Sequence, residues 1–309
     1  MTGIISISTR SGCLILLSSG LAFSAELRKF EAVEPHMGTL FRIAVYAPDR
    51  AAARAATNAA FTRVKYLDEA LSDYNPDSEL MRLTRHPAME WTPVSTDLFH
   101  ILEVSQRLAR DSGGAFDVTC GPIVRLWREA RKTRRLPTQD AIAEALSRSG
   151  YKHLLLDKER RAVRLDMTGM QLDLGAIAKG YAADEALKVL SRRGLKRAMV
   201  AASGDIAMSG APPGAKGWRI LIEPSETTQQ VLILRNAAVS TSGDRNQFVE
   251  IAGTRYSHIV DARTGMALTE SRGVTVVARR GIDADSLATA ACIPGKRVKG
   301  HRARYLVIG

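Results

Sequence analysis

Strand patterns in the second half of this chain follow one another with few helices between them, and this order constrains the fold most. Such patterns occur at 197–202, 218–223, 231–234, 248–251, 256–260 and 274–278. Helical periodicity predominates in the first half, where Phe61, Val64 and Leu67 share one face of a helix expected over 51–71. Because strands come in runs, we expect an α+β fold of mixed or antiparallel sheets packed with helices.

A chain of 309 residues is long enough to bury a large core. Hydrophobic residues make up 45% and charged residues 25%, which is ordinary for a globular protein, so we expect order except at the ends. We expect residues 26–309 to form a single domain, as one unit or as two lobes, with an unusually basic C-terminal segment.

The N-terminus is typical of an export signal. Arg10 provides a positive flank, Leu14–Phe23 is a short apolar stretch, and Ala25 is one of several small residues suited to cleavage. We therefore expect residues 1–25 to be a cleaved signal peptide, with a buried strand or an uncleaved anchor as alternatives. The protein is then exported, to the periplasm or the outer face of the inner membrane. Cys13 precedes the apolar stretch, so we do not expect a lipoprotein.

Two cysteines, Cys120 and Cys292, remain after the expected cleavage. They lie far apart in the sequence and lack the spacing of a metal site. We expect two buried thiols, although export would also permit a single disulfide between them.

The formal net charge of +12 is partly concentrated in one short segment. Between 125 and 135, six basic side chains are opposed only by Glu129. A basic surface favours anionic partners or membrane headgroups. The segment lacks interleaved aromatic residues and the chain has no nucleic-acid-binding motif, so we expect no nucleic acid partner and a solvated basic face.

Two oxygen-bearing side chains lie one turn apart on the last expected helix, which begins near Asp283. Asp285 and Thr289 are four residues apart and therefore share one face. A carboxylate and a hydroxyl suit Mg²⁺, which takes a few oxygen ligands and keeps waters for the rest. The alternative is that the acidic residues only cap the helix and complement its dipole, while Thr289 packs.

A second candidate element joins an expected strand at 170–174 to an expected helix at about 176–193. Asp173 is followed by Gly175, and Lys179 lies one helical turn further on. A strand, a glycine turn and a helix start can present backbone groups to a phosphate or a metal. The alternative is a capping aspartate and a surface lysine.

A histidine in a turn completes the candidate chemistry. His258 lies toward the end of the strand pattern at 256–260 and precedes Asp261. Near a phosphate group it could act as a general base at neutral pH. Taken alone, it would more often be structural, either stacked or hydrogen-bonded to Asp261.

Taken in order, eight short segments resemble those of the ApbE family, the FAD:protein FMN transferases. Each segment is weak evidence alone, but eight in order are specific. The segments are 37–39, 74–79, 114–122, 173–181, 203–206, 240–244, 258–265 and 284–289.

The resemblance implies a T-fold-like α+β architecture and an exported enzyme that binds FAD with Mg²⁺. Such an enzyme transfers the FMN half of FAD to a threonine hydroxyl of an acceptor protein and releases AMP. The implied acceptors are flavin-carrying subunits of membrane redox complexes. An FAD pyrophosphatase that releases FMN and AMP, and a flavin-binding protein without catalysis, are the alternatives.

The resemblance also assigns roles to residues. The metal ligands would be the carbonyl of Ala176 with Asp285 and Thr289, and the catalytic residues would be His258, as the base, and Asp285. The implied FAD contacts are Met37, Tyr74, Ala115, Phe116, Asp117, Asp173, Lys179 and Ile259.

The chain departs from the family pattern after the last helix. Pro294 interrupts the sequence early, and a basic stretch leads to an apolar segment at 305–308. We expect this closing strand to be kept and the usual intervening helix to be lost, which would change the packing behind Asp285 and Thr289.

Overall fold

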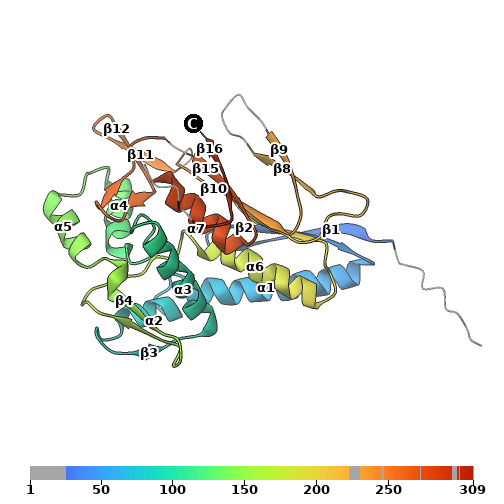
Figure 1. Ribbon diagram of the computed structural model, residues 1–309, viewed down its shortest axis with the longest axis horizontal. Helices are drawn as coiled ribbons and strands as arrows, with labels where there is room; N and C mark the ends of the chain where they lie inside the picture. The colour runs from blue at the N-terminus through green and yellow to red at the C-terminus, as the bar shows by residue number, and fades with distance from the viewer. Residues whose placement is uncertain are drawn as a thin grey trace, which may run out of the picture.

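A seven-stranded antiparallel sheet organises the molecule (Figure 1). The computed structural model describes residues 26–222, 230–244, 247–271, 273–293, 298 and 300–308. The strand order of the sheet is β1-β2-β6-β7-β10-β15-β16. The strands are β1 (Arg28–His36), β2 (Thr39–Ala47), β6 (Ala198–Ala202), β7 (Asp205–Met208), β10 (Ala237–Ser242), β15 (Gly273–Ala278) and β16 (Arg304–Ile308).

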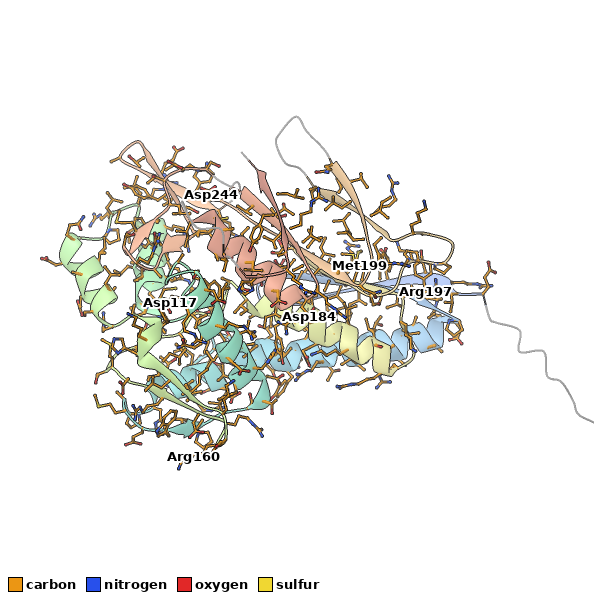
Figure 2. All side chains as sticks on the ribbon, viewed as in Figure 1. Asp117, Arg160, Asp184, Arg197, Met199 and Asp244 are labelled. Carbon is orange, nitrogen blue, oxygen red and sulfur yellow. The ribbon has the colours of Figure 1, made fainter. Side chains whose placement is uncertain are left out.

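Three helices cover one face of this sheet: α1 (Arg50–Leu71), α6 (Ala178–Arg192) and α7 (Gly281–Cys292). The helix α1 packs on β1 and β2, α6 on β6 and β7, and α7 on β10 and β15. Asp184 of α6 joins two of the helices, because its carboxylate accepts hydrogen bonds from the N–H groups of Gly281 (2.7 Å) and Ile282 (3.0 Å) (Figure 2). It thus satisfies backbone donors at the start of α7, which has no side-chain cap of its own.

A hairpin of β8 (Trp218–Ile222) and β9 (Gln230–Leu234) packs on the opposite face of the sheet. Successive strand residues point to opposite faces. Accordingly Ala44 and Val239 pack with the hairpin, whereas their neighbours Ile43 and Ala238 pack with the helices. The sheet is therefore buried on both sides along its centre.

A second core forms where helices α4 (Gly121–Thr133) and α5 (Gln139–Ser147) pack against two small hairpins. The indole Nε1 of Trp127 donates a 2.8 Å hydrogen bond to the carbonyl of Gly265 and ties the helix to the hairpins. The hairpin strands are β11 (Phe248–Ile251), β12 (Thr254–Ser257), β13 (Val260–Asp261) and β14 (Met266–Ala267).

The remaining elements extend the main core beside α1. Here α3 packs against the small sheet β3-β5-β4 and contacts α7. These elements are α2 (Glu79–Arg85), β3 (Thr92–Pro93), α3 (Thr96–Asp111), a 3₁₀ turn (Tyr151–His153), β4 (Leu154–Asp157) and β5 (Ala162–Leu165).

The fold class predicted from the sequence is confirmed, but the strands expected at 170–174 and 256–260 differ. The 256–260 pattern is interrupted at His258 and Ile259, which separate β12 from β13. Residues 170–174 form no named strand; Gln171 makes only an isolated parallel bridge to Cys120. The strand β5 (Ala162–Leu165) pairs with β3 and β4, and not with residues 170–174. The closing strand is present as β16, paired with β15, whereas the predicted loss of a helix falls largely on residues outside the described part.

Two further predictions concern the cysteines and the termini. Cys120 and Cys292 are not joined to each other by a disulfide; Cys292 is buried and its thiol donates a 3.3 Å hydrogen bond to the carbonyl of Ser242, while Cys120 is partly exposed. The predicted signal peptide, including Cys13, lies outside the described residues. Within the described residues, no helix has the length and apolar character needed to cross a membrane.

Candidate active site

A cavity of about 750 Å³ opens where the end of β10 meets α4, the start of α6 and the middle of α7. Its walls come from the main sheet, from the hairpin β8–β9 and from the second core. Both candidate segments of the sequence, around Asp173 and around Asp285, therefore reach the same cavity.

Lys179, in the first turn of α6, lies between two buried carboxylates. Its Nζ is 3.2 Å from Oδ2 of Asp205 and 3.9 Å from Oδ2 of Asp285, and it donates to the carbonyl of Gly175 at 3.0 Å. The negative charge of Asp285, followed by that of Asp205, raises the pKa of Lys179. The ammonium therefore stays charged and places a cation in the cavity wall.

Asp285 is only 3% exposed, yet its carboxylate faces the cavity. Its Oδ2 accepts a 2.9 Å hydrogen bond from the N–H of Gly180. Burial, together with the nearby charge of Asp205, raises the pKa of Asp285 to about 7. A carboxylate that is difficult to ionise in its protein surroundings would be stabilised by a bound cation.

Hydroxyl groups surround this pair of carboxylates. Ser242 Oγ is 3.0 Å from Thr289 Oγ1, and Thr241 Oγ1 is 2.8 Å from Thr275 Oγ1. Ser240 donates a hydrogen bond to Asp205. These carboxylate and hydroxyl groups thus offer only oxygen atoms as possible metal ligands.

The donor set fits Mg²⁺ better than a softer metal. Ala176, Asp285 and Thr289 line one cavity and offer a carbonyl, a carboxylate and a hydroxyl. Mg²⁺ typically takes one or two carboxylates and completes its shell with waters and substrate phosphates. Within the described residues, no group of three or more histidine, cysteine or acidic side chains is arranged to hold a metal ion, so the fit to Mg²⁺ rests on the chemistry of Ala176, Asp285 and Thr289 alone.

His258 lines the cavity with a fixed ring orientation. Its Nδ1 is 3.1 Å from the carbonyl oxygen of Gln247, which also accepts the backbone N–H of His258 at 3.0 Å. A carbonyl can only accept, so Nδ1 carries the proton and Nε2 keeps its lone pair. Burial lowers the pKa of His258, which favours this neutral form.

The alternative in which His258 is hydrogen-bonded to Asp261 is wrong, since Asp261 instead accepts hydrogen bonds from the Arg263 guanidinium at 2.6 and 2.8 Å. His258 is thus left with one ring nitrogen tied to the backbone. Its other ring nitrogen is the only one that could take a proton from a substrate.

Arg128 of α4 joins three residues at the cavity. Its guanidinium donates to Asp73 and, at 2.8 Å, to Asp173, and it lies over the ring of Tyr74, 4.5 Å from the centroid. Burial raises the pKa of Asp173 despite this contact. Arg128 and Arg131 line the cavity, so the expectation of a wholly solvated basic face is wrong for these two.

A family model described as the ApbE family matches residues 37–304. The chain belongs to the ApbE family. The predicted family is confirmed, and with it the enzyme class, flavin transfer.

Curated relatives and solved structures agree with this assignment. A relative named FAD:protein FMN transferase from Treponema pallidum (strain Nichols) is 34% identical over 308 residues, covering 93% of this chain and 85% of the relative. One with the same name from Klebsiella pneumoniae (strain 342) is 31% identical over 268 residues, covering 84% and 77%.

The crystal structure of the flavinyl transferase ApbE of Pseudomonas stutzeri, in its apo form, has a TM-score of 0.80 at 27% identity and covers 91% of this chain and 94% of its own. The flavin transferase ApbE of Vibrio cholerae has a TM-score of 0.77 at 31% identity and covers 85% and 86%. The fold of this chain is therefore that of the ApbE flavin transferases.

Most residues that the ApbE resemblance singled out meet at the cavity. The lining includes Tyr74, Ala115, Phe116, Asp117, Asp173, Ala176, Lys179, His258, Ile259, Asp285 and Thr289. Asp117 also has a local task, because its carboxylate accepts from the N–H and Oγ1 of Thr119 and from the N–H of Tyr151. It thereby holds the loop that carries Ala115 and Phe116.

Met37 is not among the residues that line this cavity. It occupies the tight turn between β1 and β2, with a positive φ of 50°, and Gly38 follows with a φ of 71°. Its N–H donates a 2.8 Å hydrogen bond to Asp68 of α1. In the structure, Met37 shapes the turn and anchors it to the helix.

Several lining residues were not singled out individually from the sequence. Arg128 and Arg131 follow Val124 at intervals of four and three, so helical spacing alone could have placed all three on one face. Asp205 stood within a recognised ApbE segment, but only the fold shows that it reaches Lys179. No local signal marks the apolar wall of Ile220 and Ile222, which comes from the hairpin.

Proposed function

We propose that this protein transfers the FMN moiety of FAD to a threonine hydroxyl of an acceptor protein, depends on Mg²⁺ and releases AMP. The observation that carries the proposal is the meeting of His258, Lys179 and Asp285 in one cavity. Membership of the ApbE family supports flavin transfer; the acceptor hydroxyl, the metal and the leaving group are our inference.

FAD would be bound by a charged contact to its pyrophosphate and by apolar contacts to its rings. Lys179, held between Asp205 and Asp285, would place a positive charge beside the pyrophosphate of FAD. Phe116 and Ile259 offer apolar wall, and the ring of Tyr74 offers an aromatic face against which a flavin or adenine ring could stack.

The transfer is a substitution at phosphorus. The threonine oxygen forms a bond to the phosphorus of the FMN half, and the bond from that phosphorus to the bridging oxygen breaks. AMP leaves with the bond's electron pair, and the threonine proton passes to Nε2 of His258. A positioned base of this kind typically contributes ~10²–10⁴-fold.

Ala176, Asp285 and Thr289 would hold the metal. When bound, Mg²⁺ would neutralise negative charge on the pyrophosphate oxygens. Asp285 is suited to the task because it is held rigidly by Gly180 and lacks a close cationic partner at hydrogen-bond distance.

We also propose that the enzyme is exported and that its acceptors are subunits of membrane redox complexes. The leader pattern at 1–25 supports export, and the resemblance to the ApbE family supports the acceptor class. Neither proposal depends on the geometry of the cavity.

The test is to incubate the protein with FAD, Mg²⁺ and flavin-carrying subunits of redox complexes, and to look for covalent flavin fluorescence on a denaturing gel. A fluorescent acceptor band that requires Mg²⁺ supports the proposal. Tight FAD binding without any such band would overturn it, and free FMN formed in its place would indicate a pyrophosphatase.

A further inference from the structure

Basic side chains with no described ionic partner lie on and just beyond α4, next to two arginines that line the cavity. Between 121 and 139 the chain carries six basic side chains and one acidic one, Glu129. Two of the six, Arg128 and Arg131, line the cavity. The other four are exposed and form no ion pair with any described residue, and we call them the α4 basic rim: Arg125, Lys132, Arg134 and Arg135.

Helix geometry places half of this rim beside the cavity. Val124, Arg128 and Arg131 face the cavity at intervals of four and three residues. Arg125 and Lys132 each follow one of these by a single residue, which turns them by about 100° around the helix. They therefore lie next to the cavity face, on the side of α4 away from the second core.

The other half of the rim follows the end of the helix. Arg134 adopts a left-handed conformation with φ of 55°, and its N–H donates a 2.8 Å hydrogen bond to the carbonyl of Ala130. This bond closes the helix and keeps Arg134 and Arg135 about one turn beyond Arg131, which itself lines the cavity.

Helix stability does not account for the whole rim. The helix dipole favours cations in the last turn, which would explain Lys132 and Arg134. It gives no such benefit to Arg125, which lies near the beginning of α4. Four exposed cations without described partners also repel one another, so an anionic partner would relieve the repulsion.

We propose that the α4 basic rim binds an acidic segment of the acceptor protein that flanks the target threonine; this rests on the proposed function. A threonine that reaches His258 brings its flanking residues to the cavity, and the rim adjoins the part of the cavity wall formed by Arg128 and Arg131. A protein segment fits better than a bilayer, because Leu136 is the only large apolar side chain exposed between 121 and 139, too little for insertion.

The test measures binding separately from transfer. Two labelled peptides with a single threonine, one rich in aspartate and one rich in lysine, are titrated with the FAD-loaded protein, and anisotropy is recorded. We expect the aspartate-rich peptide to bind about tenfold more tightly, with the difference shrinking as salt is added. The double variant Arg134→Glu/Arg135→Glu should lose this preference and keep its affinity for FAD.

A matched control is the double variant Arg192→Glu/Arg193→Glu. These two exposed arginines also lie at the end of a helix, but that helix, α6, runs away from α4 (Figure 1). We expect the control to bind both peptides as the unmodified protein does. The proposal would be overturned if both double variants lost the preference for the aspartate-rich peptide equally. It would also be overturned if the unmodified protein bound both peptides equally well.

Two further measurements, vesicle binding and flavin transfer, distinguish an acidic-segment site from a membrane surface and from a failure of the proposed function. If Arg134→Glu/Arg135→Glu weakens binding to phosphatidylglycerol vesicles but not to the aspartate-rich peptide, the rim faces a membrane and the proposal is wrong. Flavin transfer to the peptides is scored on its own. If transfer to every acceptor fails while the peptide preference holds, the proposed function is wrong and the acidic-segment site stands.

Discussion

The backbone N–H of Gly180 donates a 2.9 Å hydrogen bond to Oδ2 of Asp285, and this bond joins the two segments that carry the candidate chemistry. The helices α6 and α7 can approach this closely because both contact positions are glycines. A Cβ on Gly180 would lie 2.2 Å from the carbonyl oxygen of Gly281, and one on Gly281 would lie 2.3 Å from the carbonyl oxygen of Gly180.

Gly180→Ala should therefore destabilise the protein and displace Asp285. Overpacking a close contact typically costs about 1–3 kcal/mol, and here the obstacle is backbone that cannot rotate away. Urea unfolding would measure the change. Ser191→Ala, at an exposed position of the same helix, is the control and should stay within about 0.5 kcal/mol of the unmodified protein. Equal free energies of unfolding for the two variants would contradict the close approach of α6 and α7 at Gly180.

His258→Gln should abolish transfer without abolishing FAD binding. The amide can keep a hydrogen bond to the Gln247 carbonyl, but it cannot accept a proton, so kcat should fall by ~10²–10⁴. Stopped assays of covalent flavin, alongside FAD titration, would separate the two effects. A variant that transfers flavin at the normal rate would remove His258 from the mechanism.

The same histidine predicts a pH dependence. Only the neutral imidazole can act as a base, and protonation removes it as the pH falls through its pKa. Burial lowers that pKa from the ordinary value of 6.5. With Mg²⁺ saturating, so that Asp285 stays ionised, the acid limb of kcat/KM should therefore lie below pH 6.5, with most activity retained at that pH. An acid limb above pH 6.5 would show that another group is limiting.

Asp285→Asn should uncouple the protein from Mg²⁺. The amide oxygen can still accept from Gly180, so the fold should persist, but the charge that attracts the cation is lost. Mg²⁺ should raise the Tm of the unmodified protein by mass action and leave that of the variant unchanged. If both proteins respond equally to Mg²⁺, the metal binds elsewhere.

Arg128→Met should weaken FAD binding and stability together. The change leaves the carboxylates of Asp73 and Asp173 without their shared partner and removes the guanidinium from the ring of Tyr74. Loss of one partner of a half-buried pair costs about 1–3 kcal/mol. Arg131→Met removes an equal charge with no described ion pair and should affect stability less. Thermal melts and FAD titrations of both variants would show whether the bridge matters.

The sequence predicted those parts of the fold and site that depend on local pattern. The long helix α1 and the strands β2 and β11 follow from periodicity and turn residues, whereas the closing strand β16 was expected from the resemblance to the ApbE family. Asp285 and Thr289 were placed on one face by their spacing. Eight ordered segments then indicated the family, because together they are far more specific than any one of them.

What the sequence could not predict depends on contacts between distant segments. Nothing near Asp205 indicates that it pairs with Lys179, and nothing near Asp184 indicates that it caps α7. The strand expected at 170–174 failed because Gln171 finds a single bridge partner, Cys120, instead of a neighbouring strand. The sequence led us to expect a solvated Arg128, because its two acidic partners, Asp73 and Asp173, lie 55 and 45 residues away in the chain.

The most direct test of the account is to count AMP released against flavin bound covalently to the acceptor in one reaction with FAD and Mg²⁺. Transfer predicts equal amounts of the two products, with no free FMN, and predicts that His258→Gln lowers both together. AMP accompanied by free FMN, with no flavin on the acceptor, would contradict the account and identify a pyrophosphatase.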